Sequence, residues 1–207
     1  MDEGIIERFE EFLEVLGAQN AIDFVRELNE LYLQSGRFYH NLEHIDNCLA
    51  EFDEIKELLD DPKAVEFAIW YHDAIYDAKA KDNELKSAEL AAGVCNALGL
   101  SSDFSSKVFD LILSTKHDFV PIDFDAKFMV DIDLSIFGQD ADKFGKYEQG
   151  IRNEYALVEP EAFNVGRSAV LIKFLGRPAI YLTEKFSQKY EAKARENLNE
   201  SLKKLFD

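Results

Sequence analysis

Residues 64–76 read AVEFAIWYHDAIY, and this stretch decides the fold. Ten of its thirteen residues are apolar or aromatic, and the exceptions are Glu66, His72 and Asp73. Little of a helix with this composition can face water, so the pattern predicts a buried helix over residues 62–76. The His–Asp pair inside it must be compensated, because an unpaired buried carboxylate is very costly unless a cation or a metal takes it up. For His72 alone, a core histidine bonded to a neighbouring carboxylate is the simpler interpretation.

The rest of the chain has the same helical period. Apolar residues recur at intervals of three and four, and the sequence has only 10 Gly and 4 Pro. Asn41, Asp61 (before a proline) and Thr183 can cap helix starts, and Gly99 and Gly138 suit the left-handed residue that closes a helix. The predicted helices span residues 4–16, 20–35, 42–59, 62–76, 83–98, 104–114, 125–137, 140–157, 160–175 and 184–205. We therefore predict an all-α protein, one bundle-like domain over residues 1–207 on which the helix 184–205 packs.

That last helix carries an apolar stripe, which docks either on this body or on a second subunit of a homodimer. The stripe consists of Tyr190, Ala194, Leu198, Leu202 and Leu205.

The composition is that of a folded, acidic protein. Among 207 residues, 23 Lys and Arg stand against 41 Asp and Glu, which gives a formal net charge of −18. This charge opposes binding to nucleic-acid polymers and to anionic membrane surfaces, and a small anionic substrate needs local cations or a metal. Cys48 and Cys95 fall within helical patterns, as buried thiols do in a reducing compartment. Because neither a secretory signal nor a membrane span is recognisable, we expect a cytoplasmic protein.

Two histidines precede the buried stretch in the segment YHNLEH, residues 39–44. His40 and His44 are four residues apart, a spacing that brings both to one side of a helix. On the predicted helix 42–59, His44 lies at the edge of the apolar stripe, one turn before Cys48. It therefore points to a boundary between core and cleft. Solvated surface histidines are the alternative.

The segment MVDIDLSIFG, residues 129–138, adds two aspartates. At about 100° per residue, Asp133 falls in the middle of the apolar face, whereas Asp131 falls on the polar side with Lys127 and Ser135. The helical wheel thus predicts that Asp133 is the buried carboxylate. A His, a His–Asp pair and an Asp on three helices compensate one another if they converge on a divalent metal, which neutralises both carboxylates.

The order His44, His72-Asp73, Asp133 resembles the His … His-Asp … Asp order of the HD-domain metal-dependent phosphohydrolases, an all-α superfamily. YHNLEH is similar to the YHNxxH signature of cyclic-nucleotide phosphodiesterases, and DLS at residues 133–135 resembles their ADLS segment, with Ile132 in place of Ala. The strings YHNLEHI, WYHDAIYD, DNELKSAELA and AIYLTEKFSQKYEAKARENL together look like a family of small predicted HD phosphohydrolases with undefined substrates. This resemblance covers nearly the whole chain. The chain is shorter than the phosphodiesterase domain and lacks a counterpart of its glutamine-and-aromatic purine clamp, so cyclic-nucleotide specificity is not implied.

The resemblance implies an HD-domain helical bundle that hydrolyses a small phosphate ester, such as a nucleotide. His44, His72, Asp73 and Asp133 would be the metal ligands, and they leave positions open for water and a phosphate oxygen. Mixed nitrogen and oxygen ligands suit Mn, Fe, Co, Ni, Zn or Mg without choosing among them. One alternative is an HD-type di-iron oxygenase, for which four histidines in total are few. Another is a non-enzymatic interaction module with a structural metal, although such closed sites usually recruit cysteines.

The resemblance also implies roles for residues around the metal. His40 would be the general acid that protonates the leaving oxygen, and a structural histidine at the helix start is its alternative. Asp77 could orient the attacking water or hold a second metal, or it is a surface carboxylate at a helix end. Arg37, Lys116 and His117 are candidates for contact with the substrate phosphate. Surface solvation is the alternative for Arg37, and C-terminal helix capping is the alternative for His117.

Overall fold

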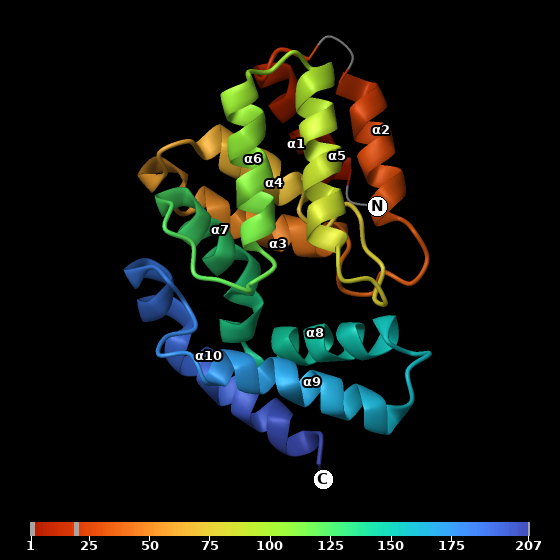
Figure 1. Ribbon diagram of the computed structural model, residues 1–207, viewed down its shortest axis with the longest axis vertical. Helices are drawn as coiled ribbons and strands as arrows, with labels where there is room; N and C mark the ends of the chain where they lie inside the picture. The colour runs from red at the N-terminus through yellow and green to blue at the C-terminus, as the bar shows by residue number, and fades with distance from the viewer. Residues whose placement is uncertain (1–2, 19–20, 207) are drawn as a thin grey trace. The chain divides into compact units, whose positions relative to one another are not determined.

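A computed structural model describes residues 3–18 and 21–206, and within these residues it contains ten α-helices, two 3-10 helices and no β-strand (Figure 1). The all-α prediction is therefore confirmed. The elements are α1 (Glu3–Val15), α2 (Ala21–Tyr32), α3 (Leu42–Asp53), η1 (Lys56–Leu58), α4 (Pro62–Tyr71), α5 (Asn83–Ala97), α6 (Ser102–Ser114), α7 (Phe124–Asp133), η2 (Leu134–Gly138), α8 (Ala141–Glu154), α9 (Pro160–Leu175) and α10 (Glu184–Lys204). Among the described residues, no helix is both long and apolar enough to cross a membrane.

The chain divides into two compact units, Met1–Met129 and Val130–Asp207. Each is described by itself, and the single-domain organisation stays a prediction. Helix α7 begins in the first unit, and its last residues, together with η2, belong to the second.

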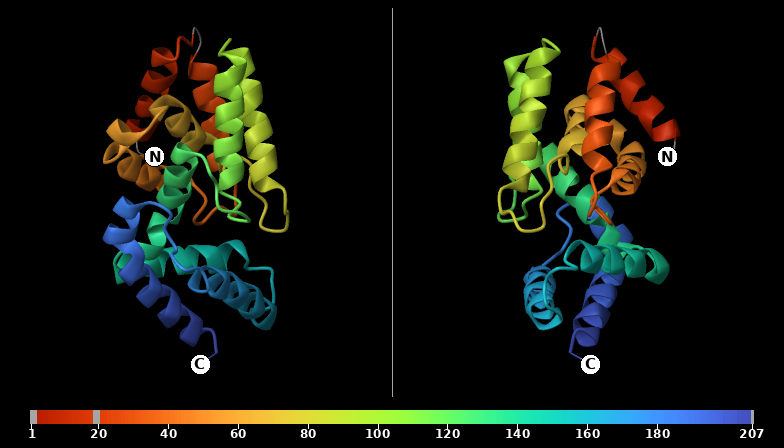
Figure 2. Two further views of the ribbon diagram at one scale, coloured as in Figure 1. Left: turned by 60° about the vertical axis from the view of Figure 1, so that its left-hand side comes forward. Right: turned by 90° about the vertical axis from the view of Figure 1, so that its right-hand side faces the viewer.

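The first unit is built around α4, the helix of the stretch that decides the fold. Every residue from Ala64 to Tyr71 is buried except Glu66. Helices α3, α5 and α6 pack against α4, and α5 and α6 run side by side (Figure 2). The Trp70 ring lies 4.6 Å from that of Phe9 on α1. Burial of these aromatic side chains contributes the apolar area on which this unit depends.

The caps predicted from the sequence are present. Asn41 accepts from the backbone N–H groups of Glu43 and His44, Asp61 accepts from Ala64, and Thr183 accepts from Phe186. Each satisfies a donor that the first helical turn leaves without an intrahelical partner.

Only one of the two predicted glycine stops has the expected backbone. Gly99 has a φ of 70° and closes α5 in the left-handed region. Gly138 is not among the residues with positive φ. It is the last residue of η2, where the side chain of Tyr190 packs so closely that a Cβ would collide with it. The absence of a side chain, and not a left-handed turn, explains glycine at this position.

The helix predicted over residues 62–76 ends earlier, at Tyr71, with His72 as its C-cap residue. The main-chain groups beyond it find other partners. Ser87 Oγ accepts from the N–H of Ile75 at 3.0 Å, and Arg37 donates to the carbonyls of Asp73 and Ala74. The His–Asp pair therefore lies in the turn that follows the buried helix and not inside it.

In the second unit, α10 packs along η2 and α9, and α8 packs on η2. Asn197 on α10 donates to the carbonyls of Phe137 and Gln139, both at 2.8 Å. Tyr190, Ala194 and Leu198 of the predicted stripe are buried. The first part of that stripe therefore lies on the helix that packs on η2 and α9 within this unit.

Candidate metal centre

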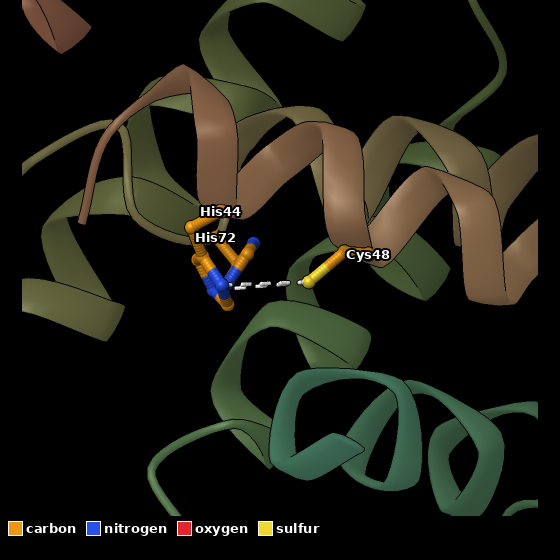
Figure 3. Close-up of side chains that lie close together, drawn as sticks. All are labelled: His44, Cys48 and His72. Carbon is orange, nitrogen blue, oxygen red and sulfur yellow. Dashed lines mark hydrogen bonds between the residues drawn. The ribbon is translucent and has the colours of Figure 1, made fainter. Parts of the chain in front are cut away.

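His44 and His72 come together in the first unit. The Asn41 cap starts α3, so His44 occupies the first turn of that helix, and His72 stands directly at the end of α4. Both side chains are buried, and their Nε2 atoms lie 3.1 Å apart (Figure 3). Two of the predicted metal ligands thus point their ring nitrogens at each other.

The ring of His72 is oriented by the backbone. Its Nδ1 lies 2.9 Å from the carbonyl oxygen of Ile69, and because a carbonyl can only accept, Nδ1 donates. In the neutral imidazole the lone pair is then on Nε2, the atom that faces His44. A histidine held in this way, with one nitrogen bonded to a carbonyl and the other exposing its lone pair, has the arrangement of a metal ligand.

Asp73 supplies an oxygen to the same place. Its Oδ2 lies 3.2 Å from His72 Nε2 and 3.4 Å from His44 Nε2. With the 3.1 Å between the two nitrogens, the three donor atoms form a nearly equilateral triangle. Neighbouring ligands about 2.1 Å from one ion are separated by about 3.0 Å at octahedral angles and about 3.4 Å at tetrahedral angles. The three donors are therefore spaced as ligands of a single divalent ion are spaced.

The carboxyl of Asp73 responds strongly to its neighbours. Burial by itself raises its pKa, but the interactions with the neighbouring imidazoles of His72, His40 and His44 outweigh it and bring the pKa well below the usual range. The carboxylate is thus anionic and suited to bind a cation.

Cys48 also belongs to this cluster. His44, Cys48 and His72 are all buried, their candidate ligand atoms lie within 4.8 Å of one another, and together they could hold a metal ion (Figure 3). The Cys48 Sγ lies 3.7 Å from His44 Nε2 and 3.8 Å from His44 Nδ1. An atom that shares a metal with Nε2 lies beyond that nitrogen and is much farther from Nδ1. The nearly equal distances therefore place the sulfur beside the imidazole ring.

The sequence interpretation named Cys48 only as a landmark one turn after His44. The signal that would have found it is the His-x-x-x-Cys spacing, which places both side chains on the same side of a helix. Both Cys48 and Cys95 are buried and neither is in a disulfide, as the sequence predicts.

His40 lies close to these candidate ligands. Its half-exposed ring stacks on that of Tyr76, with centroids 4.1 Å apart and an interplanar angle of 23°. The centroid of His40 is 6.2 Å from that of His44, and the Tyr39 ring lies 4.7 Å from His44. The structure thus brings His40 to the rim of the cluster, where its role as a general acid stays a prediction.

Arg37 is not solvated on the surface, so that alternative is wrong. The side chain is only 9% exposed, because its guanidinium donates to the main-chain carbonyls of His40, Asp73 and Ala74. Its predicted contact with substrate is not tested by this geometry.

The remaining substrate and catalytic candidates of the first unit lie in turns. Asp77 is exposed, and its Oδ1 accepts from the N–H of Lys79 at 2.9 Å. Lys116 forms an exposed ion pair with Asp118, 3.3 Å apart, and His117 follows it with a φ of 58°. Their predicted roles in catalysis and substrate binding stay predictions.

The helical wheel assigned the burial of the two aspartates of α7 the wrong way round. Asp131, predicted on the polar side, is fully buried, and its two oxygens accept from the N–H groups of Leu182 and Thr183, both at 2.7 Å. Asp133, predicted to be the buried one, is half-buried at the junction of α7 and η2. The wheel failed because the segment before α10 covers the side of α7 that carries Asp131. Asp133 belongs to the second unit, and its role as a ligand stays a prediction.

A pocket with a volume of about 730 Å³ opens at the start of α3. It is lined by Ile5, Tyr32, Leu33, Gln34, Arg37, Asn41, Leu42, Glu43, Asp46 and Asn47. By the helical period, His44 and Cys48 lie on a different face of α3 from Leu42 and Asp46. Arg37 borders both this pocket and the cluster.

Comparison of the chain with known protein families, curated proteins and solved structures gives no match in any of the three. Membership of the HD superfamily therefore stays a prediction that rests on the order and spacing of the motifs.

Proposed function

We propose that this protein is a metal-dependent phosphohydrolase of the HD type that cleaves a small phosphate ester, such as a nucleotide. The observation that carries the proposal is the triangle formed by His44 Nε2, His72 Nε2 and Asp73 Oδ2, with edges of 3.1, 3.2 and 3.4 Å. An anionic oxygen beside two imidazole nitrogens, with the His72 ring held through its Nδ1 by a carbonyl, is a donor set suited to a divalent cation. The order of the motifs along the chain supports the HD assignment.

His44, His72 and Asp73 would hold the divalent metal, and the family pattern adds Asp133 as the fourth ligand. Once bound, such an ion supplies positive charge for a phosphoryl group and lowers the pKa of a coordinated water. In a chain with a net charge of −18, an anionic ester needs local positive charge of this kind. The mixed ligand set admits Mn, Fe, Co, Ni, Zn or Mg.

His40 is the proton donor in this proposal. Its ring is half-exposed and is held by stacking on Tyr76, so it can reach a leaving group while remaining close to the ligands. Donation of its proton to the leaving oxygen removes the need to expel an alkoxide.

A second candidate is a non-enzymatic module with a structural metal, and Cys48 is the observation that favours it. A thiolate from Cys48 beside His44 and His72 would give a ligand set typical of closed zinc sites. The two candidates differ in whether Asp73 or Cys48 is required for the metal and in whether a coordination position stays open for substrate.

Metal content and phosphate release test both candidates. The purified chain is reconstituted with Mn, Co, Ni, Fe, Zn or Mg, and bound metal is measured before phosphate release from nucleotides, sugar phosphates and p-nitrophenyl phosphate. A hydrolase binds metal stoichiometrically and releases phosphate. Binding without release from any ester favours the structural module, and a chain that stays metal-free after reconstitution contradicts both.

His40→Ala tests the chemical step. If His40 donates the proton, the variant keeps its metal and fold but loses ~10²–10⁴ in kcat on alkyl phosphates and nucleotides. Esters of p-nitrophenol have an acidic leaving group that needs little protonation, so they should be affected far less. A uniform loss on every ester, with a lower melting temperature, indicates a structural His40. Loss of metal would move His40 into the coordination sphere.

A further inference from the structure

Arg37 connects the two segments that carry the candidate centre. Nη1 donates to the carbonyl of His40 at 3.0 Å and to that of Asp73 at 2.6 Å, and Nη2 donates to the carbonyl of Ala74 at 2.7 Å. One nitrogen therefore bonds the segment of the proposed proton donor and the segment of a proposed ligand at the same time.

Two aromatic rings flank the guanidinium. The Cζ atom of Arg37 lies 5.2 Å from the centroid of the Tyr32 ring and 5.7 Å from that of Tyr76. Tyr32 donates from its hydroxyl to the carbonyl of Trp70 at 2.9 Å, which fixes it to the end of α4. Tyr76 is the ring on which His40 stacks. The position of the His40 imidazole thus depends on Arg37 through both the backbone and Tyr76.

These contacts use properties that only arginine has among the cationic side chains. The guanidinium is a rigid planar fork that can bond several acceptors at fixed angles and stack on aromatic rings, whereas a lysine ammonium is a compact point charge. Three carbonyls from two separate segments meet this fork. A lysine at the same place could not satisfy all three in the same geometry.

We propose that Arg37 is a positioning residue, which holds the turn of Asp73 and the ring of His40 in register with each other. It acts through main-chain carbonyls and through Tyr76, without touching substrate. This assignment replaces the predicted contact with substrate. It rests on the proposed function for the roles of Asp73 and His40, but the geometry that it describes can be measured without any activity.

The test compares Arg37→Lys with Arg8→Lys in the full chain. Arg8 is a matched control, because it also joins separate segments of the first unit, through side-chain bonds to Asp53 and Glu66. Replacing either arginine removes part of a multiple contact and lowers the melting temperature. Only Arg37→Lys should disturb the centre.

The first readout is Co²⁺ affinity, measured by titration below the melting temperature of each variant. We expect Arg37→Lys to weaken Co²⁺ binding ~10–100-fold, the usual effect of losing a group that orients a ligand. Arg8→Lys should bind Co²⁺ as the wild type does.

The second readout needs no metal. In the metal-free protein, the proton NMR signals of the His40 ring are displaced by the ring current of Tyr76. Arg37→Lys should move these signals toward their positions in an unstacked histidine, and Arg8→Lys should leave them unchanged.

The inference is overturned if either readout stays at its wild-type value in Arg37→Lys, because Arg37 then contributes only to stability. Unchanged Co²⁺ affinity with a raised KM alone would return Arg37 to substrate binding, which also contradicts the proposal. A wild-type chain that releases no phosphate refutes the proposed hydrolase instead. Co²⁺ affinity and the His40 signals would still decide the role of Arg37.

Discussion

The carboxylates of Asp73 and Asp131 are both largely shielded from water, but they differ in the groups that surround them. Asp131 accepts hydrogen bonds at 2.7 Å from two consecutive backbone N–H groups, those of Leu182 and Thr183. Asp73 places Oδ2 within 3.4 Å of the Nε2 atoms of His44 and His72. Backbone N–H donors satisfy a carboxylate without any ion, whereas an imidazole nitrogen satisfies it only when that nitrogen carries a proton, and otherwise a metal can take the place of the proton. The kind of neighbour, and not burial itself, separates a structural carboxylate from a candidate ligand.

The electrostatics of the two groups differ in the same way. Burial raises the pKa of Asp131 to about 6, although hydrogen bonds from Leu182 and Thr183 oppose the rise. For Asp73 the effect of burial is outweighed by the interactions with the imidazoles of His72, His40 and His44, so its pKa is lowered. Asp73 therefore favours its anionic form, which a bound metal would stabilise in place of protons on the imidazoles.

Asp73→Asn should give the largest effect. The amide keeps the shape but loses the negative charge that binds a cation, so stoichiometric metal binding should be abolished while the metal-free fold is retained. Elemental analysis measures the metal. The gain in melting temperature that a bound metal gives the wild type should disappear in the variant. A variant with full metal content would show that Asp73 is no ligand, and His72→Ala provides the positive control for loss of binding.

Asp133→Ala tests whether the second unit contributes a ligand. We expect loss of stoichiometric metal with little loss of stability, because Asp133 is only half-buried. Asp131→Ala should retain the metal, since its two oxygens are engaged by the start of α10. Loss of metal from Asp131→Ala alone would reverse the assignment of the two aspartates.

Asp131→Ala should instead act on stability. Removal of the carboxylate leaves two part-buried N–H donors without their acceptor, which lowers the free energy of unfolding by about 2–4 kcal/mol. Asp140 is a matched control, because its exposed Oδ1 also accepts from two backbone N–H groups, those of Asp142 and Lys143. Asp140→Ala should cost less, since water can replace the carboxylate there. Equal losses in chemical denaturation would mean that burial of Asp131 adds nothing.

The local features of this molecule could be predicted from the sequence, whereas contacts between distant segments could not. The period of the apolar residues located the start of each helix to within two positions, but the helix predicted over 42–59 ends at Asp53, before a separate 3-10 helix. The caps at Asn41, Asp61 and Thr183 follow from local chemistry. The wheel misplaced Asp131 because its partners stand about fifty residues later, before α10. The end of α4 was misjudged because Arg37 and Ser87 take up the main-chain groups of the following turn.

In the candidate site, too, local features could be predicted from the sequence and contacts between distant segments could not. His44, His72 and Asp73 could be chosen from the sequence, because a polar residue within an apolar pattern stands out in one dimension. Burial of Arg37 could not be predicted, since a single arginine in a loop gives no sign of three carbonyls from two segments. Cys48 was overlooked for the opposite reason, because a thiol in an apolar helix resembles ordinary core packing.

Cys48→Ser should give the smallest effect and decides between the two proposed functions. The substitution keeps the size of the side chain but removes a thiol that is able to bind a soft metal. Because the sulfur lies beside the His44 ring, at 3.7 and 3.8 Å from its two nitrogens, we expect full metal content and at most a small loss of stability. Cys95→Ser, at the other buried thiol, controls for the cost of placing a hydroxyl in the core. Elemental analysis and melting curves are compared for the two variants. Metal lost from Cys48→Ser but kept in Asp73→Asn would make the centre a closed His-Cys-His site and would favour the structural module over the hydrolase.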